Sequence, residues 1–399
     1  MVALATASVL TLAACGGGSG SSSASDSSSG APTSGPKLTG TPIPIGVISS
    51  LSGPQAPSSN QGDTVAPAWA EWVNANGGLN GHPVKIISVD DGGDPAKAQA
   101  AEKKLVDEDK VVAILVGSDN LVPAYDQDAI SKGVPLVSGS ANSADWYSNP
   151  GMFPTVTDVV SGQATQLMVA QKYGHAKKFA DLYCAEVAAC ANGTKIQGPV
   201  AEKLGMGFTS LAVSSTATSY TAQCLQLQQD KVDYAQLNFS TAAAAKFVQD
   251  CQAQGFNPTW GSSAGAIGKD LLDIKGITVY GPAYAFPSVA DTAPAKTFRD
   301  AMKNYAKGDN WAEGTGSFTW SGLEVLRKAL ANAGAQVTPQ DVTTALNTIS
   351  KDDLDGLLPN PVTFTAGQPV AFGSHPCAFV IAIKDGKTQA PTGTVCASA

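Results

Sequence analysis

Charged residues, histidines and closely spaced cysteines are all scarce in this sequence. Charged residues occupy 15% of the 399 positions, the net charge is −8, and the only histidines are His82, His175 and His375. No two cysteines have CxxC spacing, so a zinc site is not indicated. An acidic chain also lacks the basic patch that nucleic acid requires. We therefore expect no metal, no cofactor and no nucleic-acid partner.

Long hydrophobic runs are missing after the first residues. No later stretch approaches the roughly 20 apolar residues that cross a bilayer, although hydrophobic residues make up 43% of the chain. This composition is typical of a globular protein. The length is sufficient for two domains of ordinary size and a tail, each domain with its own core.

The first 15 residues are apolar and end in small residues before Cys15. They fit the apolar region and cleavage site of a secretory signal, but no Lys or Arg precedes them. Leu12-Ala13-Ala14-Cys15 resembles the bacterial lipobox. That resemblance implies a lipoprotein signal peptide over 1–15, a lipid anchor on Cys15 and an extracytoplasmic location on the bacterial cell membrane; the alternative is a chance cysteine. Residues 16–40, rich in Gly and Ser, predict a flexible tether.

The six remaining cysteines are an even number in a chain that we expect to be exported, which favours disulfides. An Asp385-Gly386 dipeptide follows the apolar run 379–383 and predicts a tight hairpin turn, which would bring its flanking cysteines nearly opposite each other. The other cysteines are favoured as near neighbours, with buried free thiols as the alternative. The expected pairs are Cys377–Cys396, Cys184–Cys190 and Cys224–Cys251.

After residue 40, short apolar runs alternate with longer segments of helical periodicity. The runs predict strands at 43–49, 84–90, 111–116, 135–137, 179–183, 207–213, 234–239, 259–261 and 277–280. The periodic segments predict helices at 65–73, 94–108, 122–132, 163–172, 192–204, 220–231, 242–254, 294–307, 318–333 and 342–349. Such alternation favours parallel sheets, and its restart near residue 163 predicts two doubly wound α/β lobes. We expect the strand at 277–280 to return to the first lobe.

Several stretches of the first lobe resemble the branched-chain amino acid (Leu/Ile/Val) binding protein family of ABC transporter substrate-binding proteins. In chain order they are Leu51-Ser52-Gly53-Pro54, Asn74-Ala75-Asn76-Gly77-Gly78-Leu79-Asn80-Gly81-His82-Pro83-Val84, Asp90-Asp91-Gly92-Gly93-Asp94-Pro95, Val116-Gly117-Ser118 and the segment 132–142. The rest of the chain resembles the family mainly in its layout and in Gln254-Gly255-Phe256 after a helix.

The resemblance implies a type I periplasmic-binding fold, in which two Rossmann-like lobes are joined by three hinge crossings. The first lobe would comprise 41–154 plus 280–360, and the second 155–279 plus 361–399. It also implies a monomeric, non-enzymatic protein that closes on a small polar organic ligand and delivers it to the permease of an ABC transporter. Open α/β sheets bind ligands at the carboxyl ends of their strands, which is consistent with a site between the lobes.

In that family, the loops after the third and fourth strands hold the ligand's carboxylate. The matching positions are Ser118, Ser140 and Asn142, and Ser138 lies beside them. The preceding glycine would let the backbone approach the ligand, and the following helix start would favour an anion. The alternatives are helix capping by Ser118 or Asp119 and a plain polar turn for the others. The Asp119 carboxylate would repel an acidic ligand unless it caps the helix or faces a cation.

Other positions are expected to shape the pocket. Ser58 stands where family members often carry an aromatic side chain, which implies a wider pocket. Tyr183 and Asn238 end strands of the second lobe, and Trp146 lies in a loop where it could stack on a ligand, with core or hinge packing as the alternative for the aromatic residues. Ser263 stands where amino-acid-binding relatives place a carboxylate for the ligand's ammonium group. The ligand class therefore stays open among amino acids, amides, small acids and polar aromatics.

Two functions from other classes remain. The segment 261–265 matches the G-x-S-x-G pattern of hydrolases, with Asp291 or Asp355 and then His375 in the required chain order. Hydrolysis would need Ser263 and His375 within roughly 3 Å of each other. The other alternative is a ligand-sensing surface receptor that works without a transporter.

Overall fold

The computed structural model describes residues 37–53, 56–138, 143–186, 188–262 and 267–397. Its first sheet has five strands in the order β2-β1-β3-β4-β5, paired in parallel throughout. The strands are β1 (Ile43–Ser49), β2 (Val84–Asp90), β3 (Ala113–Val116), β4 (Leu136–Ser138) and β5 (Met152–Phe153). All four residues of β3 are buried, because helices cover both faces of a parallel sheet and leave no solvated side.

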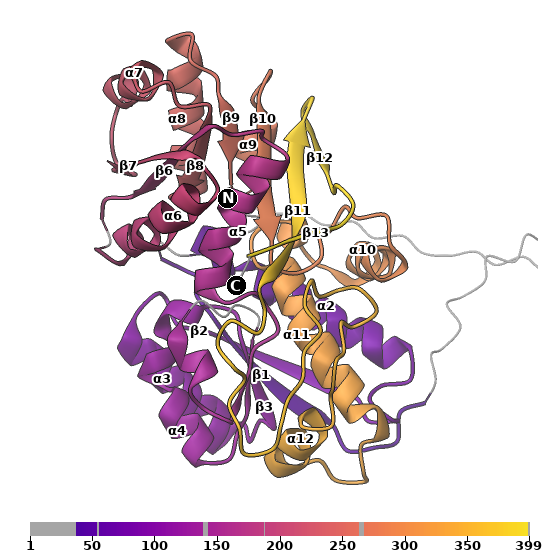
Figure 1. Ribbon diagram of the computed structural model, residues 1–399. Coiled ribbons are helices and arrows are strands. Elements are labelled where there is room, and N and C mark those ends of the chain that lie inside the picture. Colours follow the sequence, from indigo (N-terminus) through magenta and orange to yellow (C-terminus); the bar gives the residue numbers. More distant parts are fainter. Residues whose placement is uncertain (1–36, 54–55, 139–142, 187, 263–266, 398–399) are drawn as a thin grey trace, which may run out of the picture. The chain divides into compact units, whose positions relative to one another are not determined.

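Two groups of helices pack on this sheet, and together with it they form the first lobe. Figure 1 shows α2 and α11 on one face and α3 and α4 on the other. The indole of Trp69 on α2 donates to Glu324 on α11 over 2.7 Å, which joins the two helices of one face. The helices of the first lobe are α1 (Ala56–Ser59), α2 (Gln61–Ala75), α3 (Pro95–Lys103), α4 (Asp126–Ser131), α10 (Ala293–Tyr305), α11 (Gly316–Ala329) and α12 (Pro339–Leu346).

The second sheet follows the order β12-β11-β10-β9-β8-β6-β7, and β13 also pairs with β11. The pairings from β7 to β10 are parallel, whereas β11 runs antiparallel to its three partners. The strands are β6 (Lys178–Cys184), β7 (Gly207–Val213), β8 (Tyr234–Asn238), β9 (Thr259–Gly261), β10 (Thr278–Ala283), β11 (Cys377–Lys384), β12 (Lys387–Gln389) and β13 (Thr394–Cys396).

Side chains alternate between the two faces of this second sheet. Phe179 and Tyr234 pack in the cluster that also holds residues of α5 and α6, whereas Ala180 and Leu182 pack in the cluster that holds residues of α7 and α8. These buried strand residues therefore belong alternately to two separate cores. The helices of the second lobe are α5 (Val159–Lys172), α6 (Asn192–Lys203), α7 (Thr221–Gln229), α8 (Thr241–Ala253) and α9 (Lys269–Leu272).

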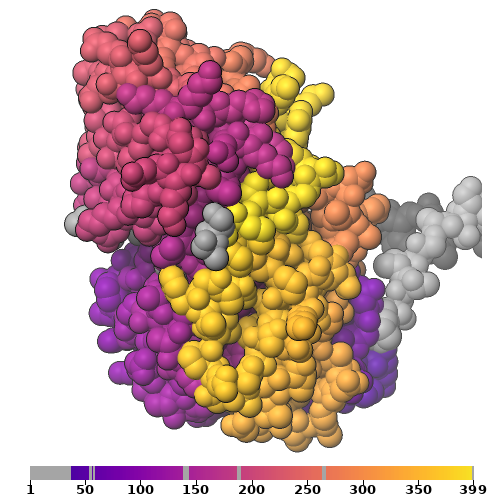
Figure 2. Space-filling view, viewed as in Figure 1, coloured from indigo at the N-terminus to yellow at the C-terminus, as the bar shows by residue number. Residues whose placement is uncertain are grey.

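The predicted fold class, two α/β lobes with parallel sheets, is confirmed. The first core draws residues from the segments 43–156 and 285–370, and the largest core of the second lobe draws residues from 180–283 and from β11. The strand at 277–280 was expected to return to the first lobe, but β10 pairs entirely within the second sheet. The chain therefore crosses between the cores near residues 157, 284 and 371–377. Figure 2 shows the yellow C-terminal segment at the surface of the viewed face.

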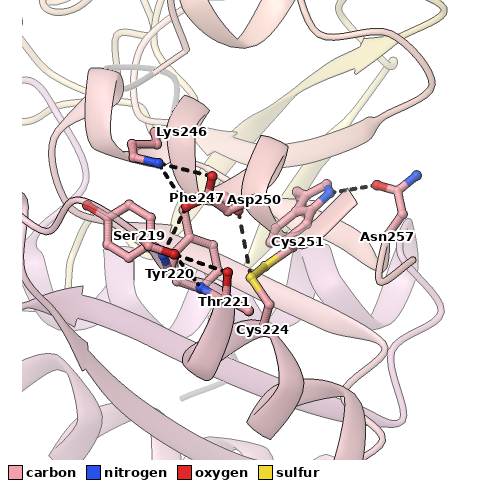
Figure 3. Close-up of a disulfide and its surroundings, with 10 residues drawn as sticks. Ser219, Tyr220, Thr221, Cys224, Lys246, Phe247, Asp250, Cys251 and Asn257 are labelled. Atoms are coloured by element: carbon pink, nitrogen blue, oxygen red, sulfur yellow. Dashed lines mark hydrogen bonds and ion pairs between the residues drawn. A yellow bond between two sulfur atoms is a disulfide. The ribbon is translucent and has the colours of Figure 1, made fainter. Parts of the chain in front are cut away.

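All three predicted disulfides are present. Cys377 and Cys396 lie directly opposite each other in the β11–β13 pairing. The turn at Asp385-Gly386 has positive φ at both residues (54° and 69°), as a two-residue hairpin turn requires. The remaining disulfides are Cys184–Cys190 and Cys224–Cys251, and Figure 3 shows the latter joining α7 to α8 beside Tyr220 and Phe247.

The start of α3 is as predicted, because the Asp94 side chain accepts from Ala96 N (2.8 Å) and Lys97 N (3.0 Å). The single helix expected at 122–132 is wrong. The chain forms a 3-10 helix over Asp119–Ala124 and then the short α4. Pro123 has no N–H to continue the helix, and Tyr125 takes a non-helical backbone conformation at the junction (φ −143°).

Candidate functional site

The carboxyl edge of the first sheet carries a row of serines. β1, β3 and β4 run parallel, so the residues at their ends meet at one edge. Ser50 directly follows β1, Ser118 follows β3 after one intervening glycine, and Ser138 ends β4 in register with Val116. Ser50 and Ser118 are buried, with 0% and 5% of their surface exposed. The structure thus brings Ser118 to the strand edge where the sequence predicted a ligand site.

A short hydrogen-bond chain connects these hydroxyl groups to a carboxylate. Ser118 Oγ lies 2.9 Å from Ser50 Oγ, and Ser50 Oγ donates to Asp91 Oδ1 over 2.5 Å. The same Asp91 oxygen accepts from Gly93 N over 2.8 Å. Ser118 precedes the 3-10 helix, yet its side chain makes no capping bond, so the capping alternative for Ser118 is wrong. Sequence reasoning missed Ser50 and Asp91, although Ser50 precedes one of the motifs that carry the family resemblance and Asp91 lies within another.

Gly117 has a packing role at this edge. A Cβ atom on Gly117 would lie 1.9 Å from Ser49 Oγ, so the Ser49 side chain would have to move to make room for it. The sequence suggested instead that this glycine lets the backbone approach a ligand. The packing of Ser49 gives the glycine a second, structural reason.

Asp119 is held by an indole from the next loop. Trp146 Nε1 donates to Asp119 Oδ1, and the two residues are 0% and 4% exposed. Burial, followed by the negative charges of Asp119 and Asp91, raises the pKa of Tyr125 well above its usual value. Because Trp146 is packed in the first core, its ring has no exposed face for the stacking that the sequence suggested.

The second sheet presents an amide cluster at its own carboxyl edge. Tyr183 and Asn238 are neighbours in the β6–β8 register. Asn238 Nδ2 donates to Asp181 Oδ1 (2.7 Å) and Gln166 Oε1 (3.1 Å), and Gln166 Nε2 lies 3.4 Å from Asn238 Oδ1. Both donors of the Asn238 amide are therefore engaged within the lobe. Asn238 Oδ1 also accepts from Gln236 Nε2 over 3.3 Å, so the whole amide group is engaged within the lobe.

This cluster extends into the interior of the second lobe. Gln197 on α6 donates to the Oε1 atoms of Gln166 (2.7 Å) and Gln163 (2.8 Å) on α5. Asp181 is 1% exposed, and burial raises its pKa to about 6, although the bond from Asn238 opposes the shift. Sequence reasoning missed these residues; a carboxylate within the otherwise apolar run of β6 was the available signal.

Some predicted site residues cannot be placed. Cys15, Ser140, Asn142 and Ser263 lie outside the described residues, as do the side chains of Ser58 and Ser138. Within the described part, no group of three or more His, Cys, Asp or Glu is arranged to hold a metal ion.

His375, the base required by the hydrolase alternative, is a packed residue. It is 2% exposed, its Nδ1 lies 3.2 Å from the carbonyl oxygen of Val156, and its ring packs edge-on against Tyr147. Burial lowers its pKa, which favours a neutral imidazole. The residue thus has a structural explanation in the segment that joins the lobes.

Comparison with known proteins gives a consistent result. The family model described as periplasmic binding protein matches residues 42–387. The Leu/Ile/Val-binding protein of Escherichia coli (strain K12) is 23% identical over 325 residues, which cover 79% of this chain and 86% of the relative.

Solved structures share the fold. The branched-chain amino acid transporter substrate-binding protein LivJ of Streptococcus pneumoniae, in complex with isoleucine, superimposes with a TM-score of 0.71 at 18% identity, covering 88% of this chain and 99% of that one. A fatty acid ABC transporter substrate-binding protein from Thermomonospora curvata gives 0.68 at 20% identity, covering 91% and 94%. Since the family binds its ligands without converting them, the hydrolase alternative is wrong. This chain belongs to the periplasmic binding protein family and is a substrate-binding protein, not an enzyme.

Proposed function

We propose that this protein is the substrate-binding lipoprotein of an ABC importer and captures a small polar organic molecule between its two lobes. The observation that carries the proposal is that both parallel sheets end in polar side chains, Ser50 and Ser118 in one lobe and Tyr183 and Asn238 in the other. Carboxyl edges of open α/β sheets are the usual place for a ligand. Membership of the periplasmic binding protein family supports ligand capture rather than catalysis.

The relatives differ in ligand. The Escherichia coli relative is named for Leu, Ile and Val, the Streptococcus pneumoniae structure holds isoleucine, and the Thermomonospora curvata protein is named for fatty acids. In this chain a serine, Ser263, stands where amino-acid-binding relatives carry a carboxylate. We therefore keep amino acids, amides and small acids as the candidate ligand classes.

We propose hinge closure as the binding mechanism, with lobe boundaries near the three crossings. Polar contacts already join two of the crossing segments: Thr157 Oγ1 donates to the carbonyl of Cys377 (2.6 Å), and Asn360 Nδ2 donates to the same carbonyl (2.8 Å). A ligand that contacts both lobes favours the closed state by its differential affinity for that state. A permease can recognise the closed form.

A thermal-shift screen of amino acids, their amides and small carboxylic acids tests the capture function. A ligand that binds only the native state raises the melting temperature, by an amount that grows with the ratio of its concentration to Kd. Calorimetric titration then gives Kd for each compound that shifts it. No shift with any class would reject solute capture.

The lipid anchor is a separate part of the proposal. In the part of the chain that the structure describes, no helix is long and apolar enough to cross a membrane. We propose attachment through acylated Cys15. Metabolic labelling with a radioactive fatty acid should mark the wild type and not a Cys15→Ser variant, and a labelled variant would reject Cys15 as the anchor. Neighbouring genes for a permease and an ATPase would separate the importer from a transporter-independent sensor.

A further inference from the structure

The hydrogen bonds around Ser50 determine which group donates and which accepts at each step from Ser118 to Asp91. Asp91 Oδ1 accepts from Gly93 N (2.8 Å) and from Ser50 Oγ (2.5 Å). The Ser50 hydroxyl group is thus a donor to Asp91.

Ser50 has a single hydroxyl proton, and Asp91 receives it. The 2.9 Å contact between Ser50 Oγ and Ser118 Oγ can then be a hydrogen bond only if Ser118 donates its own proton to Ser50. Ser118 has no second proton. Toward a ligand, its hydroxyl oxygen can act only as an acceptor.

The charges near this chain point in the same direction. Asp91 is fully buried, and none of the ion pairs formed by the described residues includes it. Its Oδ2 atom has no hydrogen-bond partner among those residues. Asp119, the residue after Ser118, adds a second buried carboxylate whose Oδ1 accepts from Trp146. An anionic ligand group next to Ser118 would be repelled by these carboxylates and would find no hydrogen-bond donor in the Ser118 hydroxyl group.

We infer that the Asp91–Ser50–Ser118 chain makes this edge of the site a hydrogen-bond acceptor, which selects ligands that present an N–H group, such as a primary carboxamide or an amine, and disfavours a carboxylate. This inference rests on the proposed function and narrows its ligand class. It also reverses the role that the family resemblance implied for Ser118, namely holding a ligand carboxylate. Ser50 and Asp91 act through Ser118 and are positioning residues, whereas Ser118 is the group that touches the ligand.

Acid and amide pairs of the same shape test the inference directly. Calorimetric titrations of the full chain should use L-isoleucine with L-isoleucinamide, butyrate with butyramide, and benzoate with benzamide. We expect the amide of at least one pair to bind with a Kd at least tenfold lower than its acid. An acid that binds more tightly than its amide would overturn the inference while leaving solute capture intact.

Two serine variants distinguish the effect of breaking the Asp91–Ser50–Ser118 hydrogen bonds from the general effect of removing a buried hydroxyl group. In Ser50→Ala, the Ser118 proton is released for the ligand, so the amide-to-acid preference should fall at least fivefold. Ser321→Ala removes a buried hydroxyl that has no hydrogen-bond partner in the described part of the same lobe, and it should keep the wild-type preference.

Circular dichroism establishes that both variants are folded, and the wild-type comparison stands without them. An unchanged preference in folded Ser50→Ala overturns the inference alone. Absence of binding by all six compounds, together with a flat thermal-shift screen, overturns both the inference and the proposed function.

Discussion

At the scale of single residues, the carboxyl edge of the first sheet depends on a position without a side chain. A Cβ atom at Gly117 would lie 1.9 Å from Ser49 Oγ and 3.1 Å from Ser49 Cβ. We expect Gly117→Ala to lower the free energy of unfolding by about 1–3 kcal/mol, because the added methyl group overpacks a closed space. Urea denaturation measures the loss.

Two further variants make the Gly117 prediction specific. Adding Ser49→Gly to Gly117→Ala should restore most of the stability, since the colliding atoms are removed. Gly198→Ala in α6, where a Cβ atom would meet nothing closer than 3.7 Å, should be neutral or slightly stabilising. Equal losses in Gly117→Ala with and without Ser49→Gly would contradict the packing explanation.

Asp181 predicts a pH dependence of stability. Burial raises its pKa from 3.8 to about 6 in the folded protein. The folded state therefore favours the protonated carboxyl group of Asp181. Its contribution to the free energy of unfolding is fully present below about pH 4 and is lost as the pH rises through about 6. The loss should amount to about 2–3 kcal/mol, and Asp181→Asn should remove this part of the profile. Denaturation between pH 4 and 7 measures it, with exposed Asp270→Asn as the control; parallel profiles for wild type and Asp181→Asn would refute the assignment.

At the scale of secondary-structure elements, the disulfides differ in what they constrain. Cys224–Cys251 joins α7 to α8 across a sequence separation of 27, whereas Cys184–Cys190 closes a separation of only 6. Loop entropy predicts a loss of about 3–4 kcal/mol when the first is replaced by two alanines and about 2–3 kcal/mol for the second. Chemical denaturation of the two double variants checks the order. A larger loss for the Cys184–Cys190 variant would contradict the entropic explanation.

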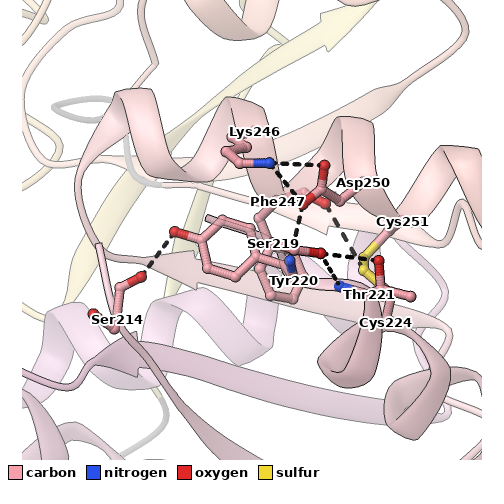
Figure 4. A network of polar contacts seen from close by, with 9 residues as sticks. All are labelled: Ser214, Ser219, Tyr220, Thr221, Cys224, Lys246, Phe247, Asp250 and Cys251. Carbon is pink, nitrogen blue, oxygen red and sulfur yellow. Dashed lines mark hydrogen bonds and ion pairs between the residues drawn. A yellow bond between two sulfur atoms is a disulfide. The ribbon is translucent and has the colours of Figure 1, made fainter. Parts of the chain in front are cut away.

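Non-covalent contacts also hold α7 against α8. Figure 4 shows Asp250 between Lys246 and the backbone of Tyr220: Tyr220 N donates to Asp250 Oδ2 over 2.9 Å, and Lys246 Nζ lies 2.9 Å from the same oxygen. The Tyr220 hydroxyl donates to the carbonyl of Ser214 (2.8 Å). Without Cys224–Cys251, the helices should therefore stay packed, and far-ultraviolet circular dichroism should be unchanged in the absence of denaturant.

At the scale of the whole molecule, the Asn360 amide group binds a segment in which the chain crosses between the lobes. Asn360 is 4% exposed, donates to the carbonyl of Cys377 and accepts from Cys377 N, each over 2.8 Å. We expect Asn360→Ala to lower the free energy of unfolding by about 1–3 kcal/mol, because Cys377 N loses its side-chain acceptor, whereas the Cys377 carbonyl keeps the bond from Thr157 Oγ1. Thermal or urea unfolding measures this loss, and exposed Asn332→Ala is the matched control. A variant as stable as the control would show that these bonds are replaceable.

Local sequence signals predicted most elements because they depend on nearest neighbours. Asp94-Pro95 starts a helix and Gly77-Gly78 follows the end of one whatever surrounds them, and Asp385-Gly386 forms its turn from its own backbone preferences. The helix predicted over 122–132 was wrong because the apolar periodicity continues through Pro123. Periodicity alone does not show that a proline interrupts the hydrogen bonds of the backbone. The polar cluster around Asp181 was missed because its partners come from three separate elements.

The amino-acid sequence by itself determined the α/β class, the order of most strands and helices, and the disulfide pairs, since each follows from periodicity, turn chemistry or spacing along the chain. Only the tertiary structure decided which sheet receives β10, why Gly117 has no side chain, and that Ser118 donates its proton to Ser50. Those outcomes depend on atoms that are distant in the sequence, and a hydrogen-bond direction follows only once every partner of a hydroxyl is in place.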